Sequence, residues 1–206
     1  MMNHRKIAST SQARTIGKGR ATLEGEIARL LSIKNSKGAL YLAAYSYGPE
    51  LLEFLVSRMS VEDDARAVLS MAFEEALNGI SSFTGRATFR TWLYILAKNA
   101  RARFFTDPYR YRGRSSISEI SGLADSIVSG PPKLATLDVE RIRRDLDEED
   151  QELLTLCFDR QLSWAEIAAI WSVGREPLDA VSLRSRCNRL VSELTEQRAS
   201  NPEAGS

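Results

Sequence analysis

Residues 83–99 read FTGRATFRTWLYILAKN, and this stretch decides the fold class. From Thr88 onward, apolar side chains recur at intervals of three and four residues, which is the spacing of one face of an α-helix. This face consists of Phe89, Trp92, Leu93, Leu96, Ala97, Ala100 and Phe104. Asp107-Pro108 follows, and proline does not continue a helix. The stretch therefore predicts a helix over about residues 88–105, preceded by a short loop that carries Phe83.

The opposite face of this predicted helix carries a basic stripe interrupted by an aromatic ring. The stripe consists of Arg90, Thr91, Tyr94, Lys98 and Arg101. Basic groups beside aromatic rings suit a nucleic-acid strand whose bases can be unstacked. A core helix whose arginines are simply solvated would show the same pattern, so the residues alone leave both interpretations open.

Similar apolar periods lie on both sides of this helix and predict an all-α protein. The predicted helices cover residues 23–33, 39–59 and 62–77 before it, and 137–146, 150–160, 164–171 and 178–197 after it. Residues 107–136 lack an apolar period and are too long for a loop within a compact domain. We therefore predict two small helical domains joined by a flexible linker. The boundaries are a basic, largely flexible N-terminal extension (1–37), a first domain (38–106), the linker (107–136), a second domain (137–197) and a tail (198–206).

Charge is segregated along the chain, although its total is almost zero. Lys and Arg number 28 and Asp and Glu number 27. The net charge is +6 over residues 1–37, −5 over 38–85, +7 over 86–114, −6 over 115–152 and −1 over 153–206. A polyanion responds to such local blocks, not to the total.

The last two predicted helices form a helix-turn-helix pattern. Ser163 and Glu166 have the spacing of a capping box at the start of the first helix. The outward face of the second helix collects Ser182, Arg184, Ser185, Arg186, Asn188 and Arg189. Such side chains reach base edges and phosphates when a recognition helix lies in the major groove. A helical hairpin with a polar surface is the alternative.

Several classes of protein are disfavoured by what the sequence lacks. One His and two isolated Cys leave no zinc cluster, and no nucleophile–base pair or phosphate-binding loop is visible. We expect no enzyme activity, no metal and no cofactor. The sequence has no apolar run of 18 or more residues and no apolar segment near its start, so we expect no membrane insertion and a cytoplasmic protein.

These motifs resemble those of a known family. Residues 83–99 resemble the signature F-x-G-x-s-x-F-R-T-W-L-x-x-I-A-x-N of bacterial RNA polymerase sigma factors of the extracytoplasmic-function (ECF) type. Residues 146–156, 162–168 and 181–189 resemble the second domain of the same family, in the same order. The resemblance implies a region 2-like bundle over 38–106, which binds core RNA polymerase and recognises and melts the minus-ten element. It also implies a region 4-like helix-turn-helix over 137–197, which recognises the minus-thirty-five element.

The resemblance also implies roles for individual residues. The minus-ten and melting surface would consist of Phe83, Arg86, Arg90, Tyr94, Lys98, Asn99 and Arg101. The recognition helix would use the six polar residues named above, Ser182 to Arg189. Core polymerase would be bound by Asp64, Val68, Leu69, Phe73 and Glu74. The partners that the resemblance implies are core RNA polymerase and promoter DNA, with an anti-sigma factor as a third candidate.

The sequence departs from the family pattern in three places. Arg66, Ala67, Ser70 and Met71 replace the usual acidic residues and glutamine of the core-binding helix. The turn over residues 172–180 is about five residues longer than is usual, and residues 1–37 have no counterpart. Two alternatives therefore stay open: a stand-alone helix-turn-helix regulator, and a polymerase-binding adaptor without promoter-opening activity.

Overall fold

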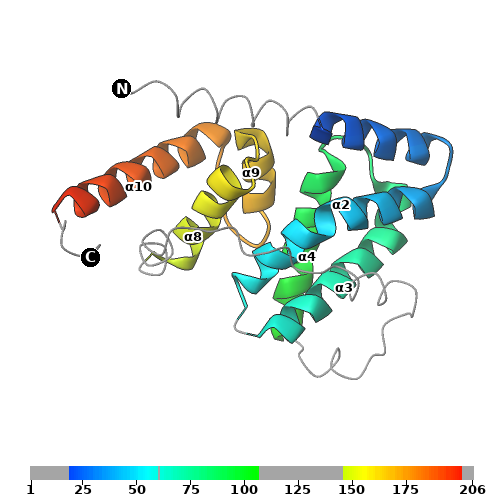
Figure 1. Cartoon of the computed structure of the whole chain (residues 1–206), viewed down its shortest axis with the longest axis horizontal. Helices are drawn as coiled ribbons and strands as arrows, with labels where there is room; N and C mark the ends of the chain where they lie inside the picture. Colours follow the sequence, from blue (N-terminus) through cyan, green and yellow to red (C-terminus); the bar gives the residue numbers. More distant parts are fainter. Residues whose placement is uncertain (1–18, 60, 107–145, 201–206) are drawn as a thin grey trace.

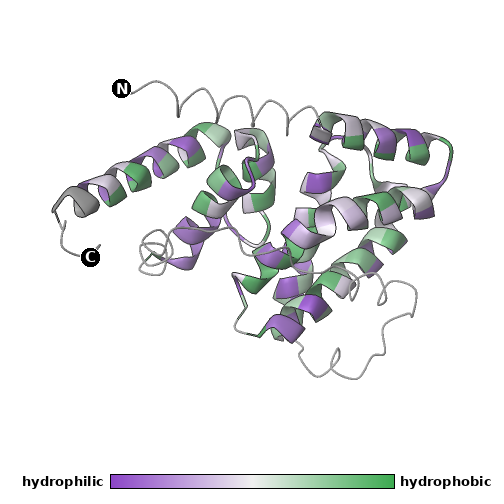
Figure 2. Cartoon of the chain, viewed as in Figure 1, coloured by the Kyte–Doolittle hydropathy of each residue, from purple (hydrophilic) through white to green (hydrophobic). Residues whose placement is uncertain are grey.

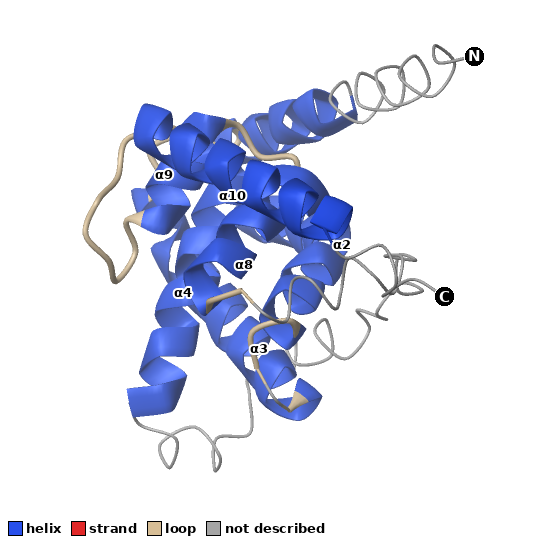
Figure 3. Ribbon diagram, turned by 90° about the vertical axis from the view of Figure 1, so that its left-hand side faces the viewer, coloured by secondary structure: helices blue, strands red, loops and turns tan. Residues whose placement is uncertain are grey.

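The computed structural model describes residues 19–59, 61–106 and 146–200. Within these ranges the chain forms helices and loops and no strand (Figure 3). The predicted all-α class is therefore confirmed. The predicted linker over residues 107–136, and all but the last residue of the helix predicted over 137–146, lie outside the described residues.

The first helical group contains the helix predicted from residues 83–99. It consists of an N-terminal helix (residues 19–32), α2 (Ser36–Val56), α3 (Glu62–Gly79), the 3₁₀ turn η1 (Ile80–Ser82) and α4 (Phe89–Thr106). Helices α2, α3 and α4 pack against one another (Figure 1). Their apolar faces meet in a core in which Leu52, Leu69 and Phe89 are completely buried. This burial is the main term that stabilises such a bundle.

The helix predicted over residues 23–33 is confirmed and runs from residue 19 to residue 32, so this part of the N-terminal extension is helical. Leu23, Ile27 and Leu30 lie on one face of the N-terminal helix, and Ile27 is buried in the core. Asn35 then caps α2, because its side-chain oxygen accepts a hydrogen bond from the Gly38 amide at 3.0 Å. The first 18 residues lie outside the described part of the chain.

Glu24 of the N-terminal helix fixes the start of α4. Its carboxylate accepts hydrogen bonds from the backbone amides of Phe89 and Arg90, at 2.7 and 3.0 Å. The hydroxyl of Tyr47 on α2 donates to the same carboxylate at 2.7 Å. The first amides of a helix lack partners within the helix, and its N-terminal end favours negative charge. One carboxylate therefore connects three helices.

The second helical group is built from capped helices. It consists of α8 (Glu148–Leu154), the π-helical turn η2 (Thr155–Asp159), α9 (Trp164–Trp171) and α10 (Ala180–Ser200). The Asp147 side chain caps α8, and Ser163 and Glu166 form the predicted capping box of α9. The Asp179 side chain accepts from the Ser182 amide at 2.6 Å, so α10 begins just after it. The single helix predicted over 150–160 instead starts at Glu148 and widens into a π turn at Thr155.

The two groups lie against each other, with α4 facing α9 (Figure 1). Helix α10 extends away from the rest of the molecule and mixes hydrophobic and hydrophilic residues along its length (Figure 2). Its apolar side, with Leu183, Cys187 and Leu190, is buried against the second group. The opposite side of its first half is left exposed.

Replacing Glu24 with Ala removes three hydrogen-bond acceptor contacts and leaves the first amides of α4 without a partner. We expect the free energy of unfolding to fall by about 2 kcal/mol, the usual value for hydrogen bonds to a charged group. Urea unfolding followed by circular dichroism measures this loss. The matched control is Glu26→Ala, since Glu26 binds exposed Arg29 on the same helix and, among the described residues, caps no other helix. An equal shift of the urea midpoint in both variants would contradict the capping role.

Candidate nucleic-acid interface

The basic stripe of α4 faces the second helical group. Arg90, its first member, is 4% exposed. Its guanidinium forms two bonds with the carboxylate of Glu50 on α2, at 2.5 and 2.9 Å, and donates to the carbonyl of Arg160 at 2.9 Å. Burial alone would lower the pKa of Arg90, but the bonds to Glu50 outweigh burial and raise it. Arg90 therefore stays charged and joins α2, α4 and the end of η2.

The N-terminal end of α4 holds a second carboxylate. Glu166 of α9 accepts hydrogen bonds from the hydroxyls of Thr88 and Thr91, both at 2.9 Å. Burial alone would raise the pKa of Glu166, but the bonds from Ser163, Thr91 and Thr88 lower it below its usual value. The charged carboxylate of one group thus binds the positive helix end of the other.

Lys98 lies near the middle of the stripe and is almost fully covered. Its ammonium donates to Glu152 Oε1 at 2.7 Å and to the Ile170 carbonyl at 3.0 Å. Burial lowers the pKa of Lys98, and the charge of Glu152 partly offsets this effect. Glu152 also accepts from Arg175 at 3.0 Å, so one buried carboxylate holds two cations.

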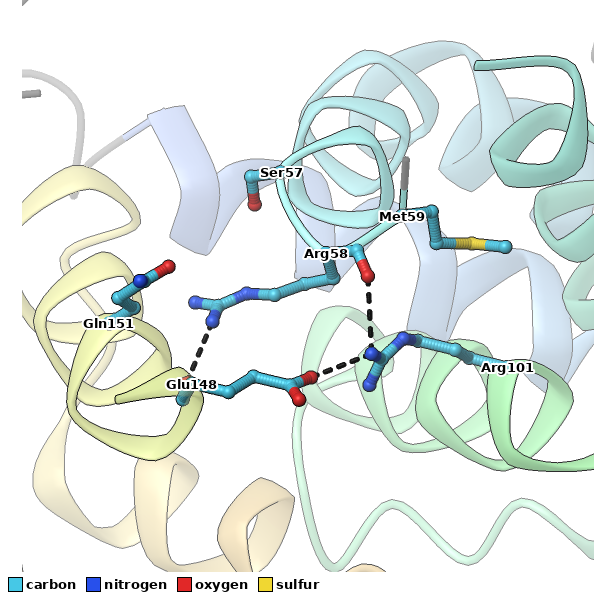
Figure 4. A pocket seen from close by; sticks show the side chains of 6 residues that line it. All are labelled: Ser57, Arg58, Met59, Arg101, Glu148 and Gln151. Atoms are coloured by element: carbon cyan, nitrogen blue, oxygen red, sulfur yellow. Dashed lines mark hydrogen bonds and ion pairs between the residues drawn. The ribbon is translucent and has the colours of Figure 1, made fainter. Parts of the chain in front are cut away.

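Arg101 is the last residue of the stripe and lies where α4 meets α8 (Figure 4). We call the contact between the two helical groups the seam. Its Nη2 lies 2.6 Å from Glu148 Oε1 and donates to the carbonyl of Arg58 at 3.1 Å. Arg58 in turn donates to the carbonyl of Glu148 at 2.8 Å. Figure 4 shows the Glu148 side chain extending from α8 toward Arg101, so one ion pair and two hydrogen bonds to backbone carbonyls connect Arg58, Arg101 and Glu148.

The structure brings four of the seven predicted minus-ten residues together on the covered side of α4, between α2 and the second group. These four are Arg90, Tyr94, Lys98 and Arg101, and Tyr94 is completely buried. Phe83 is half-buried against the rings of Phe89 and Trp92, with ring centroids 5.1 and 5.2 Å away. Arg86 is exposed on the loop before α4, and Asn99 is half-buried. The loop is therefore open to solvent while the basic stripe is covered.

The first half of α10 presents most of its predicted recognition residues to solvent. Those that are exposed are Ser182, Arg184, Ser185, Asn188 and Arg189. Arg186 instead turns toward α8, where it binds Asp150 at 2.6 Å and Glu149 at 3.1 Å. These bonds raise the pKa of Arg186 against the opposing effect of its burial. Arg186 therefore serves to hold α10 to α8 in this structure.

Relatives of the chain decide its family. No protein-family model and no solved structure matches the chain. RNA polymerase sigma factor YlaC of Bacillus subtilis (strain 168) is 30% identical over 136 residues, which cover 63% of this chain and 78% of the relative. ECF RNA polymerase sigma-E factors of Escherichia coli (strain K12) and Salmonella typhimurium (strain LT2) are 32% identical over 127 residues, 56% of this chain and 66% of theirs.

The chain belongs to the ECF-type RNA polymerase sigma factors. Sigma factors are non-enzymatic subunits, which agrees with the expectation from the sequence. Among the described residues of this sigma factor, no group of three or more His, Cys, Asp and Glu side chains is placed to hold a metal ion. Within the same ranges, no helix combines the length and hydropathy needed to span a membrane.

The predicted polymerase-binding residues divide into two sets on α3. Val68, Leu69 and Phe73 are buried in the bundle core. Asp64 and Glu74 are half-buried at the surface. A partner that approaches α3 can therefore reach two of the five residues, while the other three position the helix.

The long turn between α9 and α10 contributes a side chain to the site. Gly174 has a φ of +70°, and Arg175 follows it. The Arg175 guanidinium stacks on the ring of Trp171 at 4.5 Å and reaches Glu149 and Glu152. The unusually long turn thus supplies a cation, Arg175, which neutralises acidic residues of α8.

Sequence reasoning missed the acidic side chains that cover the stripe, namely Glu148, Glu152 and Glu166. For Glu148 and Glu152 a signal was present, because the −6 block over residues 115–152 follows directly on the +7 block over 86–114. Opposite charges of similar size suggest pairing within the chain. Glu24 was missed for a different reason: its cap joins residues 65 positions apart, which no local pattern shows.

The two thiols of the sigma factor should react slowly in the folded state. Cys187 of α10 and Cys157 of η2 interact with each other, and burial together with Cys157 raises the pKa of Cys187 to about 12. Burial also raises the pKa of Cys157. Only the thiolate is nucleophilic. We therefore expect iodoacetamide at pH 8 to modify Cys187 at least roughly tenfold more slowly than in the urea-unfolded chain, since each pKa unit changes the thiolate fraction tenfold. Cys157 should also react more slowly than in the unfolded chain. Mass spectrometry of timed samples measures the rates, and equal rates would contradict the burial.

Proposed function

We propose that this sigma factor docks on core RNA polymerase with α3, holds melted minus-ten DNA with α4 and the preceding loop, and reads the minus-thirty-five element with α10. The observation that carries the proposal is membership of the sigma family. The chemistry of the surfaces supports the assignment of roles. Transcription of bacterial promoters would place this work in the cytoplasm.

The proposed division of labour follows the predicted domains. Residues 38–106 would bind polymerase and the minus-ten element, and residues 137–197 would bind the minus-thirty-five element. Residues 107–136 would link them, and residues 198–206 would form a tail. From residue 19 onward, the extension over 1–37 would serve the first domain, because Glu24 caps α4.

The minus-ten element would be held by stacking and charge. Phe83, Arg86 and Asn99 would meet the strand first, since they lie outside the covered stripe. Unstacking a base costs a few kcal/mol, and an aromatic surface beside a cation offsets part of that cost. Arg90, Tyr94, Lys98 and Arg101 would complete the surface when α4 is uncovered.

The minus-thirty-five element would be read by the exposed face of α10. Ser182, Arg184 and Ser185 lie in its first turns, the part of a recognition helix that meets base edges. Asn188 and Arg189 follow on the same face, and Arg186 would support the helix through α8. This surface and the polymerase-binding face of α3 are also where an anti-sigma factor, the third implied partner, would act.

Run-off transcription with purified core polymerase over a pool of bacterial promoter fragments tests the proposed function. We expect promoter-dependent transcripts whose template sequences share an upstream element. Polymerase binding without transcripts would instead favour the adaptor alternative. DNA binding without polymerase association would favour the stand-alone regulator.

The recognition helix is tested with the variant Arg184→Ala/Arg189→Ala. We expect transcription from promoters that depend on the upstream element to be lost, and the salt slope of DNA binding to decrease by about one for each phosphate contact removed. Lys34→Ala/Lys37→Ala is the control, because it removes two cations far from α10. Transcription and salt slope unchanged in both variants would contradict the role of α10.

Polymerase docking is tested on α3 with Glu74→Lys. We expect at least roughly tenfold weaker association with core polymerase, because charge reversal at an interface replaces attraction with repulsion. Glu196→Lys on α10 makes the same change of charge away from α3. Fluorescence anisotropy with labelled sigma factor measures both dissociation constants. Equal dissociation constants would place the polymerase surface elsewhere.

A further inference from the structure

The end of α9 carries a tryptophan whose ring contacts two arginines. Trp171 is the last residue of α9 and is buried. The guanidinium carbon of Arg175, on the turn, lies 4.5 Å from the centroid of this ring, and that of Arg186, on α10, lies 5.2 Å away. The face of a tryptophan ring attracts a cation. One side chain of α9 therefore binds both the turn and the recognition helix.

The same two arginines share a carboxylate of α8. Glu149 Oε1 lies 3.4 Å from Arg175 Nε, and Glu149 Oε2 lies 3.1 Å from Arg186 Nη1. Each arginine also pairs with a second carboxylate of α8, at 3.0 and 2.6 Å. We call Trp171, Arg175, Arg186 and Glu149 the arginine clamp. The clamp joins α8, α9, the turn and α10.

The turn between α9 and α10 needs such a contact because of its length. A helix-turn-helix turn of three or four residues sets the angle between its helices through its own backbone. Here residues 172–179 separate the two helices, and a longer connection restrains its ends less. Gly174 turns the backbone with a φ of +70°, and Arg175 then anchors the turn to α8 and α9. Side-chain contacts thus replace the constraint that a short turn provides.

The rotation of α10 about its axis decides which of its side chains reach DNA. The Asp179 cap fixes where the helix begins. Successive residues of a helix are turned by about 100° from one another, so a small rotation moves Arg184 or Asn188 away from a base edge. Arg186 lies between these two in the sequence, and the clamp holds it against α8. The clamp therefore keeps the exposed face of α10 in one direction.

We propose that Arg175 is a positioning residue for promoter recognition, which orients α10 through Trp171 and Glu149 and so sets how sharply the sigma factor discriminates between upstream elements. This inference rests on the proposed function of α10. Phosphate contacts supply much of the affinity for DNA, whereas contacts to base edges supply the specificity. Arg175 binds α8 and α9, so its loss affects the placement of the base contacts and leaves the phosphate-binding cations of α10 present.

The orientation of α10 is tested first, on the full chain without polymerase or DNA. Spin labels placed through unnatural residues at Ala165 on α9 and Ser192 on α10, both exposed, report the distance between the two helices by pulsed electron resonance. We expect a narrow distance distribution for the original chain and a broader one for Arg175→Ala. The matched control is Arg29→Ala, which removes an exposed arginine of the N-terminal helix and should keep the narrow distribution. Equal widths in all three chains would overturn the proposal.

The effect on selectivity is measured with the holoenzyme, which is core polymerase carrying the full sigma chain. The probes are a promoter recovered by the run-off experiment and a copy of it whose upstream element is scrambled. We expect the ratio of transcription from the two templates to fall at least roughly fivefold in Arg175→Ala, as the loss of one base contact would cause. The salt slope of DNA binding should stay unchanged, unlike in Arg184→Ala/Arg189→Ala, because Arg175 contacts no phosphate.

A conservative variant separates positioning from loss of charge. Arg175→Lys keeps the charge but lacks the planar guanidinium that stacks and pairs at the clamp, so we expect the template ratio to stay lowered. A ratio equal to that of the original chain, in either variant, would overturn the proposal. If both variants fail to fold, Glu149→Gln provides the same measurement, because Glu149 is half-exposed and glutamine preserves its size.

Failure of the proposed function gives a different result. If the original chain transcribes both templates equally, α10 does not read the upstream element. The distance distributions would still show whether Arg175 orients α10, because they require neither polymerase nor DNA.

Discussion

The structure depends on the pairing of one buried cation, Arg90. A guanidinium inside a protein must find anionic or carbonyl partners, because leaving it unpaired costs more than burying apolar groups can return. Arg90 finds them on two sides: Glu50 of α2 sets the position of α4 in the first bundle, and the carbonyl of Arg160 fixes the second group against it. Arg160 itself binds Glu53, which lies one helical turn beyond Glu50 on α2. Arg90 and Arg160, together with two glutamates on one face of α2, therefore hold the two groups together. The rest of the seam follows from this contact.

Local sequence patterns predicted the helices well and their surroundings poorly. The period of residues 83–99 placed Phe89 and Leu93 on a buried face, and the capping box placed the start of α9, because both depend on neighbours within a few residues. The same period put Arg90 and Tyr94 on a separate face but said nothing of what covers that face. Arg186 shows the same limit. The helical period correctly placed it on α10, but the sequence of that helix does not indicate its acidic partners on α8. The sequence did not predict that the N-terminal helix caps α4, because the Glu24 cap joins segments far apart in sequence.

The near-zero net charge has a structural meaning. Part of the +7 block over residues 86–114 is neutralised by acidic residues at the start of the second group, where the −6 block ends. Other cations stay exposed to solvent, among them Arg184 and Arg189 on α10 and Arg86 on the loop before α4. Binding to a polyanion depends on the cations that remain exposed and not on the total charge of the chain.

A seam made of charged side chains is less strongly stabilised than an apolar seam. An apolar seam of similar size would be stabilised by every Å² removed from water, and opening it would expose that surface with no replacement. In the observed seam, desolvation offsets much of the attraction between carboxylates and cations, and unpartnered donors such as the Tyr94 hydroxyl weaken it further. On the proposed function, the cations of α4 that would bind DNA are the ones that carboxylates of the second group bind in this structure.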